Sequence, residues 1–174
     1  RDRLKANHEL TRQAMLEIGF NFADSLYHNN PSFLGLYEVA VQNMDWITDA
    51  GVRFIKQPHT DPFFLYFATT VPHGPTQAKR SWKADPRLTA IGYLDEPLTV
   101  QPSRDTIPKR LRTAGLPVND NTANLLWLDD ALGALIDTLE ATGKIDNTVI
   151  FFFNDHGQLA KGTVYQGGVH NPSI

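Results

Sequence analysis

Apolar positions at helical spacing mark two amphipathic segments of the chain. From Glu38 to Ile55 the apolar side chains recur at the period of a helix, and Asp61-Pro62 closes the linker that follows. A second and stronger helix begins at the Asp/Asn/Thr cluster of residues 120–122 and ends at Gly143. Its apolar face consists of Leu125, Leu128, Leu132, Leu135, Ile136 and Leu139.

Two continuous apolar runs predict strands that are covered on both faces. They are FFLYFA at 63–68 and VIFFF at 149–153, the latter in a strand predicted from Thr148 to Phe153, and each follows one of the predicted helices. The order helix, strand, long crossover, helix, strand is typical of an α/β fold. We therefore predict a mainly parallel sheet with helices on both faces.

The segment 80–121 separates the two halves of this pattern. It contains several prolines, many charges and only weak periodicity, which predicts a long irregular excursion over the surface. Its basic residues either contact an anionic sugar or form a solvated face. These residues are Arg80, Lys83, Arg104, Lys109 and Arg110.

Residues capable of chemistry follow both predicted strands. His73 follows the first strand, and Asp155 and His156 follow the second. The carboxyl ends of parallel strands border the ligand crevice of such a sheet, so we expect these residues to converge. Asp155 and His156 offer an oxygen and a nitrogen ligand to a divalent cation. An Asp-His-Gly turn also serves as an ordinary strand cap, and a loop histidine is often only a surface residue.

A lysine and three glycines complete the pattern. Lys161 comes shortly after the Asp-His pair and precedes Gly162 and the pair Gly167-Gly168. A metal-capable pair, a histidine between prolines and a nearby lysine together suit a tetrahedral oxyanion. Cations would neutralise its oxygens, and His73 would hydrogen-bond a substrate or leaving-group oxygen.

Composition narrows the classes of partner. The 174 residues carry a formal charge of −3 with mixed signs, so no basic stripe suggests nucleic acid and no cationic helix suggests a membrane surface. No apolar run approaches the roughly 20 residues of a membrane span. The absence of cysteine excludes disulfides and thiolate zinc sites but leaves the compartment open. We expect a small-molecule partner, and the untapered sequence at both termini suggests a fragment.

Several stretches resemble the sulfatases as a set. KGTVYQGGVHNPSI is similar to their lysine and Gly-Gly segment, DNTVIFFFNDHG to their metal-binding strand, and PFFLYFATTVPHGPTQ to their strand and histidine loop. LLWLDDALGALIDTLEATGKIDNT resembles their long helix. The resemblance runs from Glu38 to Ile174 and leaves out the residues before it.

The resemblance implies a formylglycine-dependent sulfuric ester hydrolase of the alkaline phosphatase superfamily. Residues 1–174 would then be an internal part of the catalytic domain, inactive by itself, within a parent that hydrolyses a small-molecule or saccharide sulfate ester. Asp155 and His156 match metal ligands, for Ca²⁺ or alternatively Mg²⁺ or Mn²⁺, while His73 and Lys161 match residues that contact the sulfate and assist cleavage. The formylglycine would lie upstream, and the family implies a secreted, periplasmic or lysosomal location, although a cytoplasmic one stays open.

The chain departs from the family at three points, it lacks two of the family's motifs, and two rival interpretations stay open. Many relatives have asparagine at the position of His156 and arginine at that of His170, and the spacing from Asp155 to Lys161 is short. The Cys or Ser motif that becomes formylglycine and the paired aspartates near a sulfatase N-terminus are absent. The rivals are a phosphomonoester or phosphonate hydrolase of the same superfamily, and a degenerate paralogue that acts as a binding module.

Overall fold

The computed structural model describes residues 2–27, 41–73, 80–157, 161–171 and 173–174. The chain divides into two compact units, Arg1–Thr142 and Gly143–Ile174, and each is described by itself. Among the described residues, no helix combines the length and the apolar character that a membrane span requires.

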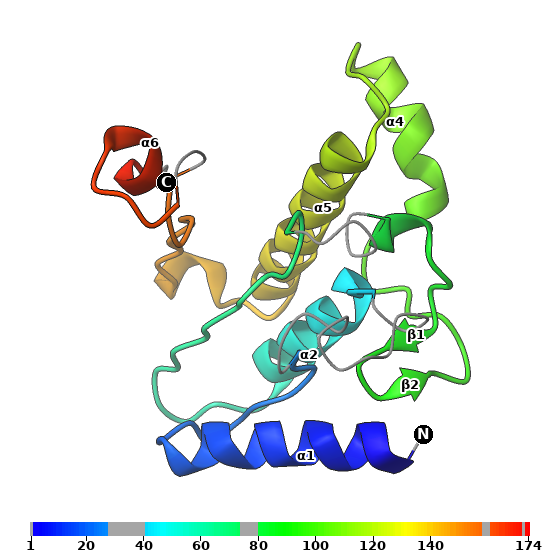
Figure 1. Ribbon diagram of the computed structural model, residues 1–174. Coiled ribbons are helices and arrows are strands. Elements are labelled where there is room, and N and C mark those ends of the chain that lie inside the picture. The colour runs from blue at the N-terminus through cyan, green and yellow to red at the C-terminus, as the bar shows by residue number, and fades with distance from the viewer. Residues whose placement is uncertain (1, 28–40, 74–79, 158–160, 172) are drawn as a thin grey trace. The chain divides into compact units, whose positions relative to one another are not determined.

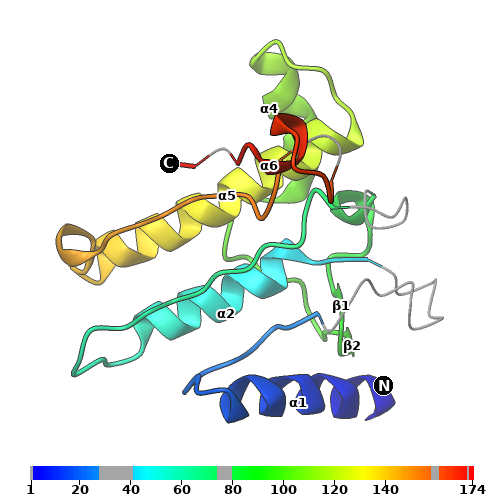
Figure 2. The same cartoon turned by 60° about the vertical axis from the view of Figure 1, so that its left-hand side comes forward.

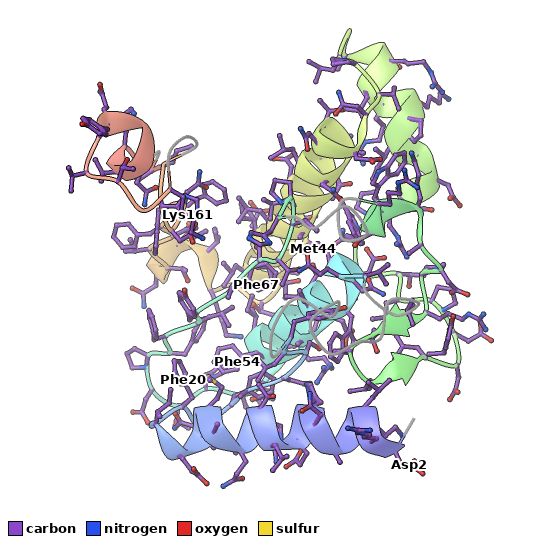
Figure 3. All side chains as sticks on the ribbon, in the orientation of Figure 1. Asp2, Phe20, Met44, Phe54, Phe67 and Lys161 are labelled. Atoms are coloured by element: carbon purple, nitrogen blue, oxygen red, sulfur yellow. The ribbon has the colours of Figure 1, made fainter. Side chains whose placement is uncertain are left out.

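The first unit is built around two helices that lie side by side, α2 (Met44–Lys56) and α5 (Asp120–Ala141) (Figure 1 and Figure 2). Gly51 makes their close approach possible, because a Cβ at this position would lie 2.8 Å from a methyl group of Leu135 and 3.3 Å from the ring of Phe67. Figure 3 labels Phe67 and also Met44, which is fully buried at the start of α2. Met44 belongs to the hydrophobic core of this unit, and Phe67 packs against that core.

Helix α2 confirms the helix predicted from Glu38 to Ile55, although residues 38–40 lie outside the described residues. Asn43 caps it, since its side chain accepts a hydrogen bond from the backbone N–H of Trp46. The same amide donates to the carbonyl oxygens of Pro86 (2.8 Å) and Leu88 (3.0 Å). One buried side chain thus begins the helix and anchors the segment that follows residue 80.

Helix α5 confirms the second predicted helix, but its predicted apolar face is only partly correct, because Leu125 is 51% exposed while Leu135 and Leu139 are buried. Asn119 and Thr122 form a capping box, in which each side chain bonds the backbone of the other residue. Trp127 and Ala131 lie in the core between α2 and the segment 80–121. Gly143 follows the helix with φ = +67°, a conformation that glycine adopts without a steric penalty.

The segment 80–121 is not irregular throughout. It contains η3 (Ser81–Lys83), the strands β1 (Leu88–Thr89) and β2 (Gly92–Tyr93), η4 (Arg104–Thr106) and α4 (Ile107–Thr113). Trp82, Ile107 and Leu111 are buried against α2 and α5. These short elements gave only weak periodicity, because η3 and β1 each bury one apolar side chain, Trp82 and Leu88, and α4 buries two.

The N-terminal helix α1 (Asp2–Glu17) lies on the opposite side of α2 from α5 (Figure 2). His8 connects it to the core: its ring lies 5.4 Å from that of Trp46, and its Nε2 accepts a hydrogen bond from the backbone N–H of Leu26. The sequence offered no prediction for this helix.

The predicted parallel sheet is not seen among the described residues, whose only sheet is the antiparallel pair β1–β2 with Leu88 opposite Tyr93. Residues 63–68 have no strand assignment, and 148–153 have only an isolated antiparallel bridge between Phe153 and Ser173. Phe64 and Phe151 are each 77% exposed, so the expected burial on both faces is absent here. A strand buried on both faces needs hydrogen-bonded neighbours and covering helices, which the described residues do not supply to these runs.

The second unit contains η5 (Ile145–Asn147), the apolar run after it, and α6 (Gln166–Val169). Phe152 exchanges two backbone hydrogen bonds with Ile174, at 2.9 and 2.8 Å. The end of the chain therefore pairs with the run that precedes Asp155.

Candidate functional site

Asp155 and His156 occupy a bend that Asn154 separates from the paired residues Phe152 and Phe153. The Asp155 side chain is 83% exposed and that of His156 33% exposed. Asp155 Oδ1 lies 3.6 Å from His156 Nε2. The two candidate ligand atoms are thus adjacent, on an exposed Asp155 and a half-buried His156.

The tautomer of His156 suits a ligand role. Its Nδ1 lies 2.6 Å from the carbonyl oxygen of Gly157, and because a carbonyl oxygen only accepts, Nδ1 carries the proton. In the neutral ring the lone pair is then on Nε2, which lies 3.6 Å from Asp155 Oδ1. Imidazole ligands in metal sites commonly donate their other N–H to a carbonyl oxygen in this way, so the pair fits a divalent cation. Among the described residues no group of three or more His, Cys, Asp or Glu side chains is placed to hold a metal, so this pair supplies only part of a ligand set.

The glycines of this region have a packing role that the sequence did not reveal. A Cβ at Gly157 would lie in hard contact with the carbonyl oxygen of Gly167, and 2.9 and 3.0 Å from the carbonyl carbons of Gly167 and Gly168. The backbone N–H of Gly157 also donates to Gly168 O at 2.9 Å. Only glycine at position 157 allows the backbone there to lie so close to Gly167 and Gly168. This close contact holds the Asp-His bend against α6.

Asn171 is a second residue that sequence reasoning missed. Its side-chain amide accepts from the backbone N–H of Asn154 (2.9 Å) and donates to the carbonyl oxygen of Asn154. Asparagine is common in turns, and no pattern in the sequence identifies a partner 17 positions away.

Lys161 lies in a turn of the second unit, outside its helices (Figure 3), and its side chain is exposed. Gly162 follows it with φ = +85°. An exposed lysine beside a glycine turn is free to reach an anion, and the role predicted for Lys161 stays a prediction.

His73 belongs to the first unit. It follows Val71, which is packed in the core with Met44 and Trp127, whereas His73 itself is exposed. The core therefore fixes the backbone two residues before His73. Its convergence with Asp155, His156 and Lys161 stays a prediction.

Most of the basic side chains of the segment 80–121 have internal partners. Arg110 forms a two-pronged ion pair with Asp130, and Lys83 lies 3.3 Å from Asp120 and above the ring of Trp82. Arg104 is buried and pairs with Asp45. These contacts favour a structural role over the alternative that the side chains bind an anionic sugar.

Burial dominates the titration of the Asp45–Arg104 pair. Burial raises the pKa of Asp45, although the charge of Arg104 and the hydrogen bond from Trp127 favour the ionised carboxylate. Burial likewise lowers the pKa of Arg104, against the pull of Asp45. The pair is a feature of the core of the first unit.

Comparison of the sequence with protein families shows the family to which the chain belongs. A family model described as Sulfatase matches residues 9–173, a range that includes His73, Asp155, His156 and Lys161. The chain belongs to the sulfatase family. Membership confirms the resemblance and implies the alkaline phosphatase-like α/β fold, while the parallel sheet itself stays a prediction. The match begins at residue 9, earlier than the Glu38 at which the sequence resemblance starts.

Individual relatives agree with this assignment. An arylsulfatase K of Danio rerio is 27% identical in an alignment that covers 75% of this chain and 31% of that protein. An arylsulfatase of Klebsiella aerogenes is 26% identical, covering 63% of this chain and 29% of the relative. A choline-sulfatase of Rhizobium meliloti is 49% identical over 37 residues, or 21% of this chain and 7% of that enzyme. The chain thus spans about a third or less of the curated relatives it matches.

Proposed function

We propose that the protein carrying this chain hydrolyses a sulfate ester. The observation that carries the proposal is the sulfatase match over residues 9–173, because this range includes both loops with candidate chemistry. The protonated Nδ1 of His156 and the solvent-facing Asp155 support it, since they present one nitrogen and one carboxylate ligand side by side.

Asp155 and His156 would hold a divalent cation, with Ca²⁺ as the first candidate and Mg²⁺ or Mn²⁺ as alternatives. When bound, such a cation polarises sulfate oxygens and stabilises the negative charge that builds on them. The imidazole nitrogen is a less usual ligand for Ca²⁺ than oxygen, so the identity of the ion is part of the experiment.

His73 and Lys161 would act on the substrate directly. Lys161 would neutralise a sulfate oxygen with its ammonium group, and His73 would hydrogen-bond the ester or leaving-group oxygen. The chain contains no cysteine, so a cysteine-derived formylglycine nucleophile would be supplied by another part of the protein.

The substrate proposed is a small-molecule or saccharide sulfate ester. Relatives are named arylsulfatase, choline-sulfatase and, in Formosa agariphila, ulvan-active sulfatase, and these names span aryl, small-molecule and polysaccharide sulfates. The exposed side chains of Lys161 and His73 suit the sulfate group that these substrates share.

The test is hydrolysis of 4-nitrophenyl sulfate and 4-nitrophenyl phosphate by the full-length protein, with Ca²⁺, Mg²⁺ or Mn²⁺ added. Lys161→Ala and His73→Ala should each lower kcat/KM for the sulfate by about 10²-fold or more, because each removes a preorganised contact to developing charge. Lys56→Ala, which removes an exposed lysine from the last turn of α2, is the matched control and should leave kcat/KM unchanged.

Each outcome discriminates among the interpretations. Faster hydrolysis of the phosphate would support a phosphomonoester hydrolase and overturn the sulfatase proposal. Absence of hydrolysis of both esters, with the fold intact and the cation bound, would support a binding module. Full activity of both variants would remove Lys161 and His73 from the site.

A further inference from the structure

The bend that carries Asp155 and His156 is attached to the end of the chain at three successive points. Before the bend, Phe152 exchanges backbone hydrogen bonds with Ile174. After it, the N–H of Gly157 donates to Gly168 O. Between these two points, Asn154 is bound by a side chain, the amide of Asn171.

The side-chain amide of Asn171 makes the two backbone hydrogen bonds at Asn154 that a neighbouring strand would otherwise make. A primary carboxamide presents its acceptor oxygen and one N–H donor on the same edge, unlike a trans peptide unit, whose two groups point in opposite directions. It therefore bonds the N–H and the C=O of Asn154 together, as a paired strand would. The paired segment is extended by one residue and ends immediately before Asp155.

The side chains of Asp155 and His156 depend on the backbone for their direction. Both are partly or largely exposed, so few neighbouring side chains restrict them. His156 is oriented by the carbonyl oxygen of Gly157, another backbone atom of the same bend. The atoms that fix the course of this backbone are consequently the atoms that aim the two candidate ligands.

We infer that Asn171 is a positioning residue for Asp155 and His156, acting through the backbone of Asn154. This inference rests on the proposed function, because it assigns Asn171 to the cation site of that function. Outer residues that orient metal ligands typically change metal affinity or activity by about 10-fold to 100-fold when they are mutated. Asn171 itself makes no bond to the cation or the substrate in this assignment.

The experiment compares wild-type full-length protein with Asn171→Ala, Asn171→Leu and Gln166→Ala. Leucine keeps the approximate shape of asparagine but makes none of its hydrogen bonds. An effect that both variants show is therefore due to the lost hydrogen bonds and not to a cavity left by alanine. Gln166 is the matched control, because it is an exposed amide residue on the same C-terminal segment. The readouts are the Kd for Ca²⁺ by calorimetry, kcat and KM for 4-nitrophenyl sulfate, hydrogen exchange of the Asn154 amide, and the thermal midpoint in chelator.

We expect both Asn171 variants to raise the Kd for Ca²⁺ by about 10-fold to 100-fold and to expose the Asn154 amide to exchange. Their thermal midpoints in chelator should match that of Gln166→Ala. An unchanged Kd together with a lowered midpoint would show a purely structural role and overturn the inference, while an active wild type would leave the proposed function standing. A wild type that binds none of Ca²⁺, Mg²⁺ and Mn²⁺, and does not hydrolyse the sulfate with any of them, overturns the proposed function, and the inference with it.

Discussion

Asp45 on α2 and Arg104 in η4 form a buried ion pair, with 3.2 Å between Oδ2 and Nε and only 8% of each side chain exposed. The second oxygen of Asp45 accepts a hydrogen bond from Trp127 Nε1 at 2.8 Å, and Arg104 Nη1 donates to Ser81 O at 3.0 Å. The guanidinium also stacks over the Trp127 ring, 4.7 Å from its centroid. One pair therefore joins α2, α5 and two parts of the segment 80–121.

Removing one partner of this pair should destabilise the first unit strongly. We expect Asp45→Ala to lower the free energy of unfolding by about 3–5 kcal/mol, because it leaves the Arg104 charge buried without its counter-ion. Arg53→Ala breaks only partly exposed pairs with Asp49 and Asp24 and should cost about 1 kcal/mol or less. Urea titrations followed by tryptophan fluorescence measure both, and equal losses in the two variants would contradict the prediction.

The same pair shows where sequence reasoning ends. The helices at 44–56 and 120–141 were predictable, because their periodicity and capping residues are local. The burial of Arg104 was not, since its partners Asp45 and Trp127 are distant in the sequence and an arginine in a proline-rich segment is usually exposed. The strands predicted at 63–68 and 148–153 likewise depend on neighbouring strands and covering helices. The local hydrophobic pattern does not reveal whether these are present.

For the candidate site, the sequence indicated the reactive side chains but not their supports. Asp155 and His156 were identifiable because polar ligands directly follow an apolar run, which is unusual unless something pairs with them. Asn171 and Gly157 act through backbone contacts between segments, at Asn154 and at Gly167. Such contacts depend on how the chain folds back and leave no residue-type signature.

Stability of the first unit should fall as pH decreases through the titration of His8. Burial lowers the pKa of His8 from 6.5, against the opposing charges of Asp24 and Glu9, and the ring accepts the N–H of Leu26 as a neutral group. A histidine pKa that is lower in the folded state means that the unfolded state binds more protons, so the free energy of unfolding rises with pH in this window. The contribution of neutral His8 to the free energy of unfolding is complete above pH 6.5. It is lost as the pH falls through the lower pKa of His8 in the folded state.

Chemical denaturation at a series of pH values from about 5 to 8 checks this, with His8→Gln as the variant. Glutamine keeps an acceptor without titrating in this range, so the variant should show a shallower dependence of stability on pH below neutrality. Parallel curves for the two proteins would show that His8 does not contribute.

Gly157 and Gly133 should respond in opposite ways to alanine. At Gly157 the new Cβ would meet the backbone of Gly167 and Gly168, so Gly157→Ala should displace the Asp-His bend from α6. Nothing lies within 4 Å of a Cβ at Gly133, in the interior of α5, so Gly133→Ala should stabilise the chain by up to about 1 kcal/mol. Hydrogen exchange of residues 152–157 reports the first effect and urea titration the second. Retained protection of this segment in Gly157→Ala would show that the close approach is dispensable.

The last prediction concerns metal binding by the 174-residue chain itself. Ca²⁺ prefers about six to eight oxygen ligands, whereas Asp155 and His156 offer one carboxylate and one imidazole, and the described residues contain no larger acidic or histidine cluster. We therefore expect weak binding of Ca²⁺ and Mn²⁺ by the chain alone, and tighter binding by a full-length protein that supplies further carboxylates. Isothermal titration of the chain, with Asp155→Asn as the control that removes the carboxylate charge, measures this. Two ligands on an exposed bend cannot by themselves replace the hydration shell of the ion. Tight stoichiometric binding that is abolished in Asp155→Asn would therefore contradict the prediction, because it would mean that the chain already holds a complete metal site.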